Sequence, residues 1–160
     1  MDKPSKAVIP SVRMGEFAVA RNGEKLRTLL GSCVGIALYD QRGKVGGLAH
    51  IVLPRASGPT DRPGKFVDTA IPALIAEMKK ISHGEPKLTA KIAGGANMFA
   101  ATQANAIGLQ NIESSERLLN EMRIPIIGKH CGGMQGRRMS LLTCDGKVVI
   151  EIVGEESIEL

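Results

Sequence analysis

Short apolar runs separated by turn-forming residues dominate the chain and predict a protein rich in strands. Two runs, 34–39 and 44–53, flank the polar segment 40–43 and predict a β-hairpin. A second hairpin is predicted from 138–143 and 147–153, because the intervening Asp145-Gly146 favours a tight turn. The remaining predicted strands cover 15–20, 88–93 and 124–129.

Two other segments place apolar residues at helical spacing. The first is predicted to begin with Asp68 as its N-cap, to hold Pro72 in its first turn and to end near residue 82. The second spans about 112–122, and its predicted core residues are Leu118, Leu119 and Met122. The predicted fold class is therefore α/β: a mixed, largely antiparallel α/β sandwich.

Composition narrows the class of protein. With 160 residues and a mass of 17.0 kDa, residues 1–160 are expected to form a single domain. The net charge is +5, but the basic residues are scattered along the sequence. Three Phe, one Tyr and no Trp leave few aromatic side chains on which bases could stack. Nucleic acid is therefore not an expected partner. No secretory signal or bilayer-spanning run is recognised, and membrane insertion is not expected. The three cysteines form no CxxC pair, so we expect reduced thiols in a cytoplasmic protein, without a metal or other cofactor.

Chemistry is suggested most clearly by Gly31-Ser32-Cys33, which precedes the first strand of the predicted hairpin. A cysteine on such a tight turn can expose its sulfur to a substrate. The backbone amides of Gly31, Ser32 and Cys33 can then face an oxyanion. Cys33 is therefore the candidate nucleophile, and these amides are the candidate oxyanion donors.

His50 on the second strand of the same hairpin is the candidate base. If Gln41-Arg42 is a two-residue loop, Asp40 pairs with Gly43 and Cys33 lies directly opposite His50, on the same face. Small residues on that face, including Gly35 and Gly46, would then leave room for substrate. If Gly43 instead completes a three-residue loop, Cys33 and His50 point to opposite faces.

Longer segments make the chain resemble the CheD family of chemoreceptor glutamine deamidases. The matching segments are LLGSCVGIALYD, GKVGGLAHIVLP, KFVDTAIPALIAEM, AKIAGGANMF, the spaced residues Ile107, Gly108 and Asn111, and CGGMQGRRM. The resemblance covers nearly the whole chain and implies an α/β sandwich with a Cys–His site, similar to that of bacterial toxin deamidases. It assigns the nucleophile and base to Cys33 and His50. A threonine upstream of the cysteine completes the family's site; Thr28 is the nearest candidate, and Arg27 is the alternative position.

The implied reaction is hydrolysis of selected glutamine side chains to glutamate, with release of ammonia through a cysteine thioester. The implied substrates are methyl-accepting chemotaxis receptors. The competing interpretation is a non-catalytic binding module that docks receptors or a CheC-type phosphatase.

Overall fold

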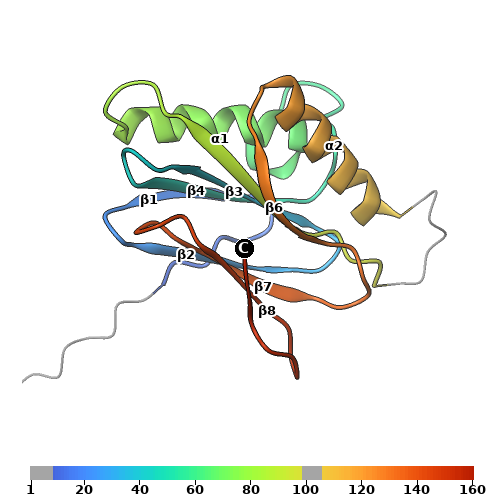
Figure 1. The fold of residues 1–160 in the computed structure, drawn as a ribbon. Helices are drawn as coiled ribbons and strands as arrows, with labels where there is room; N and C mark the ends of the chain where they lie inside the picture. Colours follow the sequence, from blue (N-terminus) through green and yellow to red (C-terminus); the bar gives the residue numbers. More distant parts are fainter. Residues whose placement is uncertain (1–8, 99–105) are drawn as a thin grey trace, which may run out of the picture.

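The computed structural model describes residues 9–98 and 106–160, which form three stacked layers (Figure 1). Two helices cover one face of a five-stranded sheet, and a four-stranded sheet packs on the other face (Figure 1). The elements in chain order are β1 (Phe17–Arg21), β2 (Lys25–Leu30), β3 (Val34–Asp40), β4 (Val45–Ile51), the 3₁₀ helix η1 (Pro63–Lys65), α1 (Val67–Ile81), β5 (Leu88–Gly94), α2 (Ile107–Glu121), β6 (Ile126–Cys131), β7 (Arg137–Leu142), β8 (Val148–Glu151) and β9 (Ile158–Glu159).

The predicted fold class is confirmed by the strand pairing. The larger sheet has the order β1-β4-β3-β5-β6 and the smaller one β2-β7-β8-β9. Every pair of adjacent strands is antiparallel except β5 and β6. Both predicted hairpins form, β3–β4 and β7–β8. Strand β2 was not predicted, although it supplies an edge of the smaller sheet.

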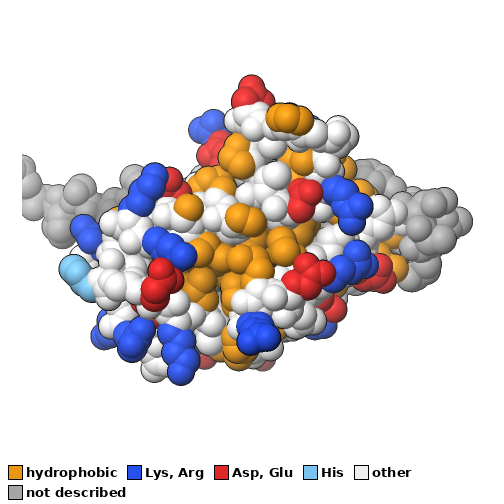
Figure 2. Space-filling view, turned by 90° about the horizontal axis from the view of Figure 1, so that it is seen from above, with side chains coloured by type: hydrophobic (Ala, Val, Ile, Leu, Met, Phe, Trp, Pro, Cys, Tyr) orange, Lys and Arg blue, Asp and Glu red, His pale blue; other side chains and the backbone are white. Residues whose placement is uncertain are grey.

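Two separate hydrophobic cores hold the layers together. One lies between the helices and the larger sheet and includes Ile36, Leu74 and Leu119. The other lies between the two sheets and includes Leu48 and Met139. From outside the helical layer, apolar side chains gather near the centre of the face and charged side chains surround them (Figure 2).

The β3–β4 register differs from both predicted registers. Asp40 pairs with Val45, so the loop covers residues 41–44, and Lys44 takes the left-handed conformation (φ 51°) that Gly43 was expected to take. His50 therefore lies opposite Gly35, and Cys33 lies just outside the ladder. The observed register differs by two positions from the first predicted one, which keeps every side chain on the predicted face.

Helix α1 starts earlier than predicted. Phe66 is its N-cap and makes no side-chain capping bond. Asp68 lies in the first turn, where its carboxylate accepts a hydrogen bond from the Ala56 amide (3.1 Å), so its predicted capping role is wrong. Pro72 lies inside the helix, beyond the first turn.

Helix α2 also starts earlier, at Ile107 instead of residue 112. Its first turns bury Gly108 and Asn111, a small and a polar residue that apolar spacing alone does not reveal. Leu119 faces the core as predicted, and Leu118 packs against it, but Met122 is 38% exposed at the C-cap.

Candidate active site

Strands β2 and β4 and the turn before β3 bring Thr28, His50 and Cys33 to the space between the two sheets. Thr28 is 1% exposed, His50 4% and Cys33 7%. Thr28 shares the buried face of β2 with Leu26 and Leu30, while Cys33 belongs to the inter-sheet core. The candidate residues thus come from both sheets and share one largely buried site.

The Thr28 hydroxyl fixes the tautomer of His50. Its Oγ1 lies 2.6 Å from the Val12 carbonyl oxygen and 2.6 Å from His50 Nδ1. A carbonyl oxygen only accepts, so the single hydroxyl proton points to Val12, and Oγ1 accepts a hydrogen bond from Nδ1–H. Neutral His50 therefore carries its proton on Nδ1 and a lone pair on Nε2. Of the two alternatives from the sequence, Thr28 rather than Arg27 contacts the histidine.

His50 Nε2 is buried and makes no hydrogen bond within residues 9–98 and 106–160. Burial lowers the pKa of His50 below its ordinary value of 6.5, because the protonated ring loses its hydration. The imidazole is therefore neutral near pH 7 and has a basic nitrogen to offer.

The Cys33 thiol is free, and burial raises its pKa above that of an ordinary thiol. Cys33 precedes Val34, the first residue of the β3–β4 ladder, and so lies diagonally from His50 across the hairpin. Diagonal positions in an antiparallel pair are roughly 7–8 Å apart, within reach of longer side chains. The resting arrangement is therefore a neutral thiol and a neutral imidazole.

Two hydrogen bonds anchor the turn that carries Cys33. Ala96 N donates to the Gly31 carbonyl (3.0 Å), and Gly95 N donates to the Cys33 carbonyl (2.9 Å). In the described part of the chain, the amides of Gly31, Ser32 and Cys33 donate no hydrogen bond. Within residues 9–98 and 106–160 the turn therefore combines fixed carbonyls with amides that make no hydrogen bond, the arrangement that an oxyanion site requires.

The small residues of the hairpin do not leave room for substrate, which corrects the expectation from the sequence. A Cβ on Gly35 would lie 2.6 Å from Met139 Sδ and 2.9 Å from Leu30 Cδ1. A Cβ on Gly46 would lie 2.9 Å from side-chain atoms of Leu141 and Thr143. These glycines instead allow the second sheet to pack closely.

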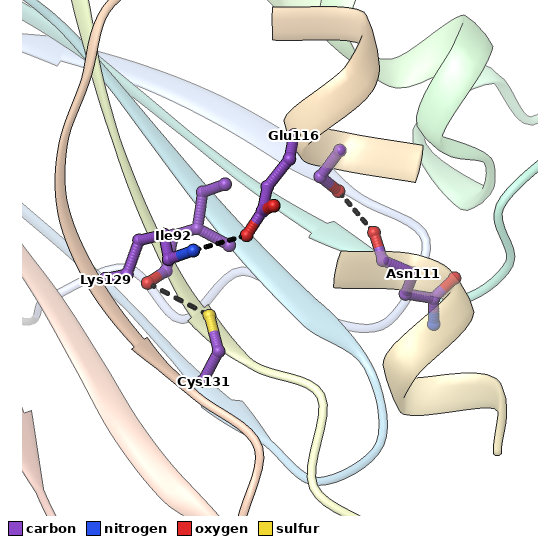
Figure 3. Close-up of polar contacts among 6 residues, drawn as sticks. Ile92, Asn111, Glu116, Lys129 and Cys131 are labelled. Atoms are coloured by element: carbon purple, nitrogen blue, oxygen red, sulfur yellow. Dashed lines mark hydrogen bonds and ion pairs between the residues drawn. The ribbon is translucent and has the colours of Figure 1, made fainter. Parts of the chain in front are cut away.

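The other histidine and cysteine near this end of the sheets have different contacts. Arg137, itself 5% exposed, donates through Nη1 to His130 Nδ1 (2.8 Å) and to the His130 carbonyl (2.6 Å). Cys131 is half-buried, with Sγ 3.5 Å from the Ile92 carbonyl (Figure 3). His130 and Cys131 thus stabilise the region around β6.

Within the described ranges, no three His, Cys, Asp or Glu side chains are arranged to hold a metal ion. A cavity of about 1000 Å³ lies at the opposite end of β3 around Asp40 and Lys91, and none of the three candidate catalytic residues lines it. Neither described helix is long and apolar enough to cross a bilayer.

Comparison with known proteins identifies the family. Residues 52–152 match the model of the family described as CheD chemotactic sensory transduction. This match begins after His50, and relatives extend the similarity over more of the chain. The probable chemoreceptor glutamine deamidase CheD of Methanococcus maripaludis strain C6 is 41% identical over 89% of this chain and 94% of its own.

Bacterial relatives are equally similar. The chemoreceptor glutamine deamidase CheD of Thermotoga maritima is 40% identical over 89% of this chain and 91% of its own. The probable chemoreceptor glutamine deamidase CheD of Clostridium novyi is 45% identical over 89% and 93%, respectively. The chain belongs to the CheD family.

Proposed function

We propose that this protein is a chemoreceptor glutamine deamidase, which hydrolyses selected glutamine side chains of methyl-accepting chemotaxis receptors to glutamate. Membership of the CheD family and the names of its relatives support the substrate class. The observation that carries the chemistry is the Thr28–His50 hydrogen bond of 2.6 Å, which leaves a basic Nε2 in the buried site that also holds Cys33.

In the first half of the reaction, His50 Nε2 takes the thiol proton while Cys33 Sγ attacks the side-chain carbonyl carbon of glutamine. Amides of the Gly31–Cys33 turn stabilise the negative charge that develops on the carbonyl oxygen. When the tetrahedral intermediate collapses, His50 returns its proton to the amide nitrogen, the C–N bond breaks, and ammonia leaves. A thioester then joins Cys33 to the substrate.

In the second half, His50 Nε2 takes a proton from water, and the resulting hydroxide attacks the thioester carbon. The C–S bond breaks, and the thiolate recovers the proton from His50. The new carboxylic acid leaves and loses its proton to solvent, which gives glutamate. Each cycle adds one negative charge to the receptor.

Burial affects how the nucleophile is activated. It raises the pKa of Cys33 and lowers the pKa of His50, so both changes oppose a thiolate–imidazolium pair at rest. We therefore assign proton transfer to the same step as attack on the substrate, when Nδ1–H bonded to Thr28 supports the charge that forms on the ring.

We place the reaction in the cytoplasm, where reducing conditions keep Cys33, Cys131 and Cys144 as free thiols. A CheC-type phosphatase is a candidate partner for a protein of this family. If the protein acted only as a docking module for that partner or for receptors, it would bind them without changing their mass.

The test is to incubate the protein with a receptor fragment, then measure ammonia release and locate modified glutamines by mass spectrometry. We expect Cys33→Ala to abolish both signals while preserving the circular dichroism spectrum. Cys144→Ala, which changes an exposed cysteine, is the matched control and should retain activity. A fragment that remains unmodified by the unaltered protein would support the docking module instead.

A further inference from the structure

We propose that Asn111 of α2 is a positioning residue that fixes the segments carrying Cys33 and His50 relative to one another. This inference rests on the proposed function, since it concerns the geometry of the same nucleophile and base. The Asn111 side chain takes no part in the reaction itself. It acts through backbone carbonyls in the segment that precedes β3 and the segment that follows β4.

The amide of Asn111 links those two segments directly. Asn111 is fully buried (0% exposed), and its Nδ2 donates to the Val52 carbonyl at 3.0 Å and to the Ser32 carbonyl at 3.4 Å. Ser32 immediately precedes Cys33, and Val52 lies two residues after His50. One side-chain NH₂ group has two donors, one for each carbonyl.

These contacts are made where the β3–β4 ladder has ended. Its last pair at this end is Val34 with Ile51. Beyond that pair the two segments hydrogen-bond to other parts of the chain: the Val52 amide donates to Lys65 O (2.9 Å), and the Cys33 carbonyl accepts from Gly95 N. The Asn111 amide therefore bridges the end of the hairpin next to the catalytic pair.

The orientation of the amide indicates which of its groups is needed. Asn111 Oδ1 is buried and has no hydrogen-bond partner in the described ranges. An unsatisfied buried acceptor is unfavourable, and an apolar residue of similar size would avoid it. Because a rotated amide would place Oδ1 against two carbonyl oxygens, the position specifically requires the two N–H donors.

The surroundings of α2 fix where this amide can lie. A Cβ on Gly108 would lie 2.5 Å from Gly95 O and 2.9 Å from Ala96 O, so the helix packs directly on the segment that anchors Gly31 and Cys33. One turn after Asn111, Ser115 Oγ donates to the Asn111 main-chain carbonyl at 2.7 Å, a bond within α2 that does not reach the side-chain amide (Figure 3). Helix, anchoring segment and amide thus form one rigid support for the site.

The test uses Asn111→Leu, which removes both donors at similar size, and Asn111→Asp, which presents only acceptors when ionised. Ser115→Ala is the matched control because Ser115 is also fully buried on α2, and its hydroxyl donates to the main-chain carbonyl of Asn111 and not to the side-chain amide. Each variant is compared for kcat and KM on the receptor fragment, and for the pH dependence of iodoacetamide alkylation at Cys33, located by mass mapping.

We expect both Asn111 variants to lower kcat on the order of 10- to 100-fold with little change in KM, since small displacements of reacting groups cost this much. The pH profile of Cys33 alkylation should also shift, whereas Ser115→Ala should leave both measurements unchanged. Alkylation needs no receptor, so it tests the positioning of Cys33 even if glutamine deamidation proves wrong.

The inference is overturned if folded Asn111→Leu or Asn111→Asp keeps kcat within about twofold, far below the penalty expected for displaced reacting groups. It is also overturned if Ser115→Ala loses as much activity, or if all losses follow the unfolded fraction measured by circular dichroism. Should one Asn111 variant fail to fold, the other gives the result. Activity that survives in Cys33→Ala would refute the proposed function separately.

Discussion

Thr28 shows how a side chain without chemistry of its own can determine that of a neighbour. Its hydroxyl donates to the Val12 carbonyl and accepts from His50 Nδ1–H, so the direction of both hydrogen bonds is fixed. A side chain that can only accept hydrogen bonds, or that can form none, would not maintain these two hydrogen bonds. The basic nitrogen of His50 is consequently selected by a residue on the other sheet.

Thr28→Val should reduce kcat by roughly 10- to 100-fold. Positioned acid–base catalysis contributes about 10²–10⁴-fold in total, and Thr28 supports only a part of it. Valine keeps the shape but leaves Nδ1–H and the Val12 carbonyl without their partner, at a cost of about 1–3 kcal/mol in unfolding free energy. Steady-state deamidation and urea unfolding measure the two effects. Thr28→Ser restores the hydroxyl and should retain most activity; equal losses in the two variants would contradict the assignment.

The pH profile of kcat/KM should reflect the buried histidine. Since burial lowers the pKa of His50 below 6.5, most of the base is neutral at pH 6.5, and the acid limb of activity should be centred at a more acidic pH. Stability should change in the same direction: the unfolded chain binds a proton at His50 before the folded one does, so unfolding free energy decreases as pH falls below 6.5. An acid limb centred above 6.5 would contradict this environment for His50.

At the scale of elements, the hairpin was predictable and its partner strand was not. Apolar runs around a polar turn identify β3 and β4, but both predicted loops were too short. Only the two-residue loop puts Cys33 and His50 on one face, and the observed four-residue loop agrees with it because the two lengths differ by an even number. Strand β2 carries charged and polar residues between Leu26 and Leu30, and its burial depends on a sheet completed by β7, far along the chain. That Thr28 and not Arg27 contacts His50 could therefore be read only from the structure.

The hydrogen bonds that hold the Cys33 turn could not be predicted from the sequence either. Gly94, Gly95 and Ala96 suggest close backbone approaches, but only the folded chain shows that Gly95 and Ala96 anchor the carbonyls of Cys33 and Gly31. Asn111 occurs in a segment that the sequence associates with the family, and nothing in its spacing shows that it reaches Ser32 and Val52.

A pair of glycine variants tests this element directly. Gly94 and Gly84 both have positive φ, 99° and 93°, so alanine is strained at either position. A Cβ on Gly94 would also lie 2.4 Å from the Cys33 carbonyl oxygen, whereas one on Gly84 meets nothing within 4 Å. Gly84→Ala should cost about 1 kcal/mol of stability with unchanged kcat.

Gly94→Ala should cost more stability and also lower kcat, because the Cys33 turn must move. Thermal unfolding and deamidation rates measured on the same samples separate the two effects. Equal stability and equal kcat in the two variants would show that the Cys33 turn tolerates displacement.

At the scale of the molecule, the central sheet separates a core under the helices from the core that contains Cys33. The five ion pairs found between described side chains are all solvent-exposed to a substantial degree, and such pairs contribute little each. Stability should therefore come mainly from the two cores, and only the inter-sheet core should also affect catalysis.

Two truncations of fully buried side chains test that division. Leu74 packs on Gly47 of β4 from the helical side, while Met139 packs on Gly35 of β3 from the inter-sheet side and pairs with Thr28 across β2 and β7. Leu74→Ala and Met139→Ala should each lower the unfolding free energy by about 2–5 kcal/mol. At a temperature where both variants remain folded, Met139→Ala should also lower kcat, because Thr28 and the strand facing His50 lose their packing. Leu74→Ala should keep the kcat of the unaltered protein, and a loss shared equally by both variants would show that the central sheet transmits disturbance from one core to the other.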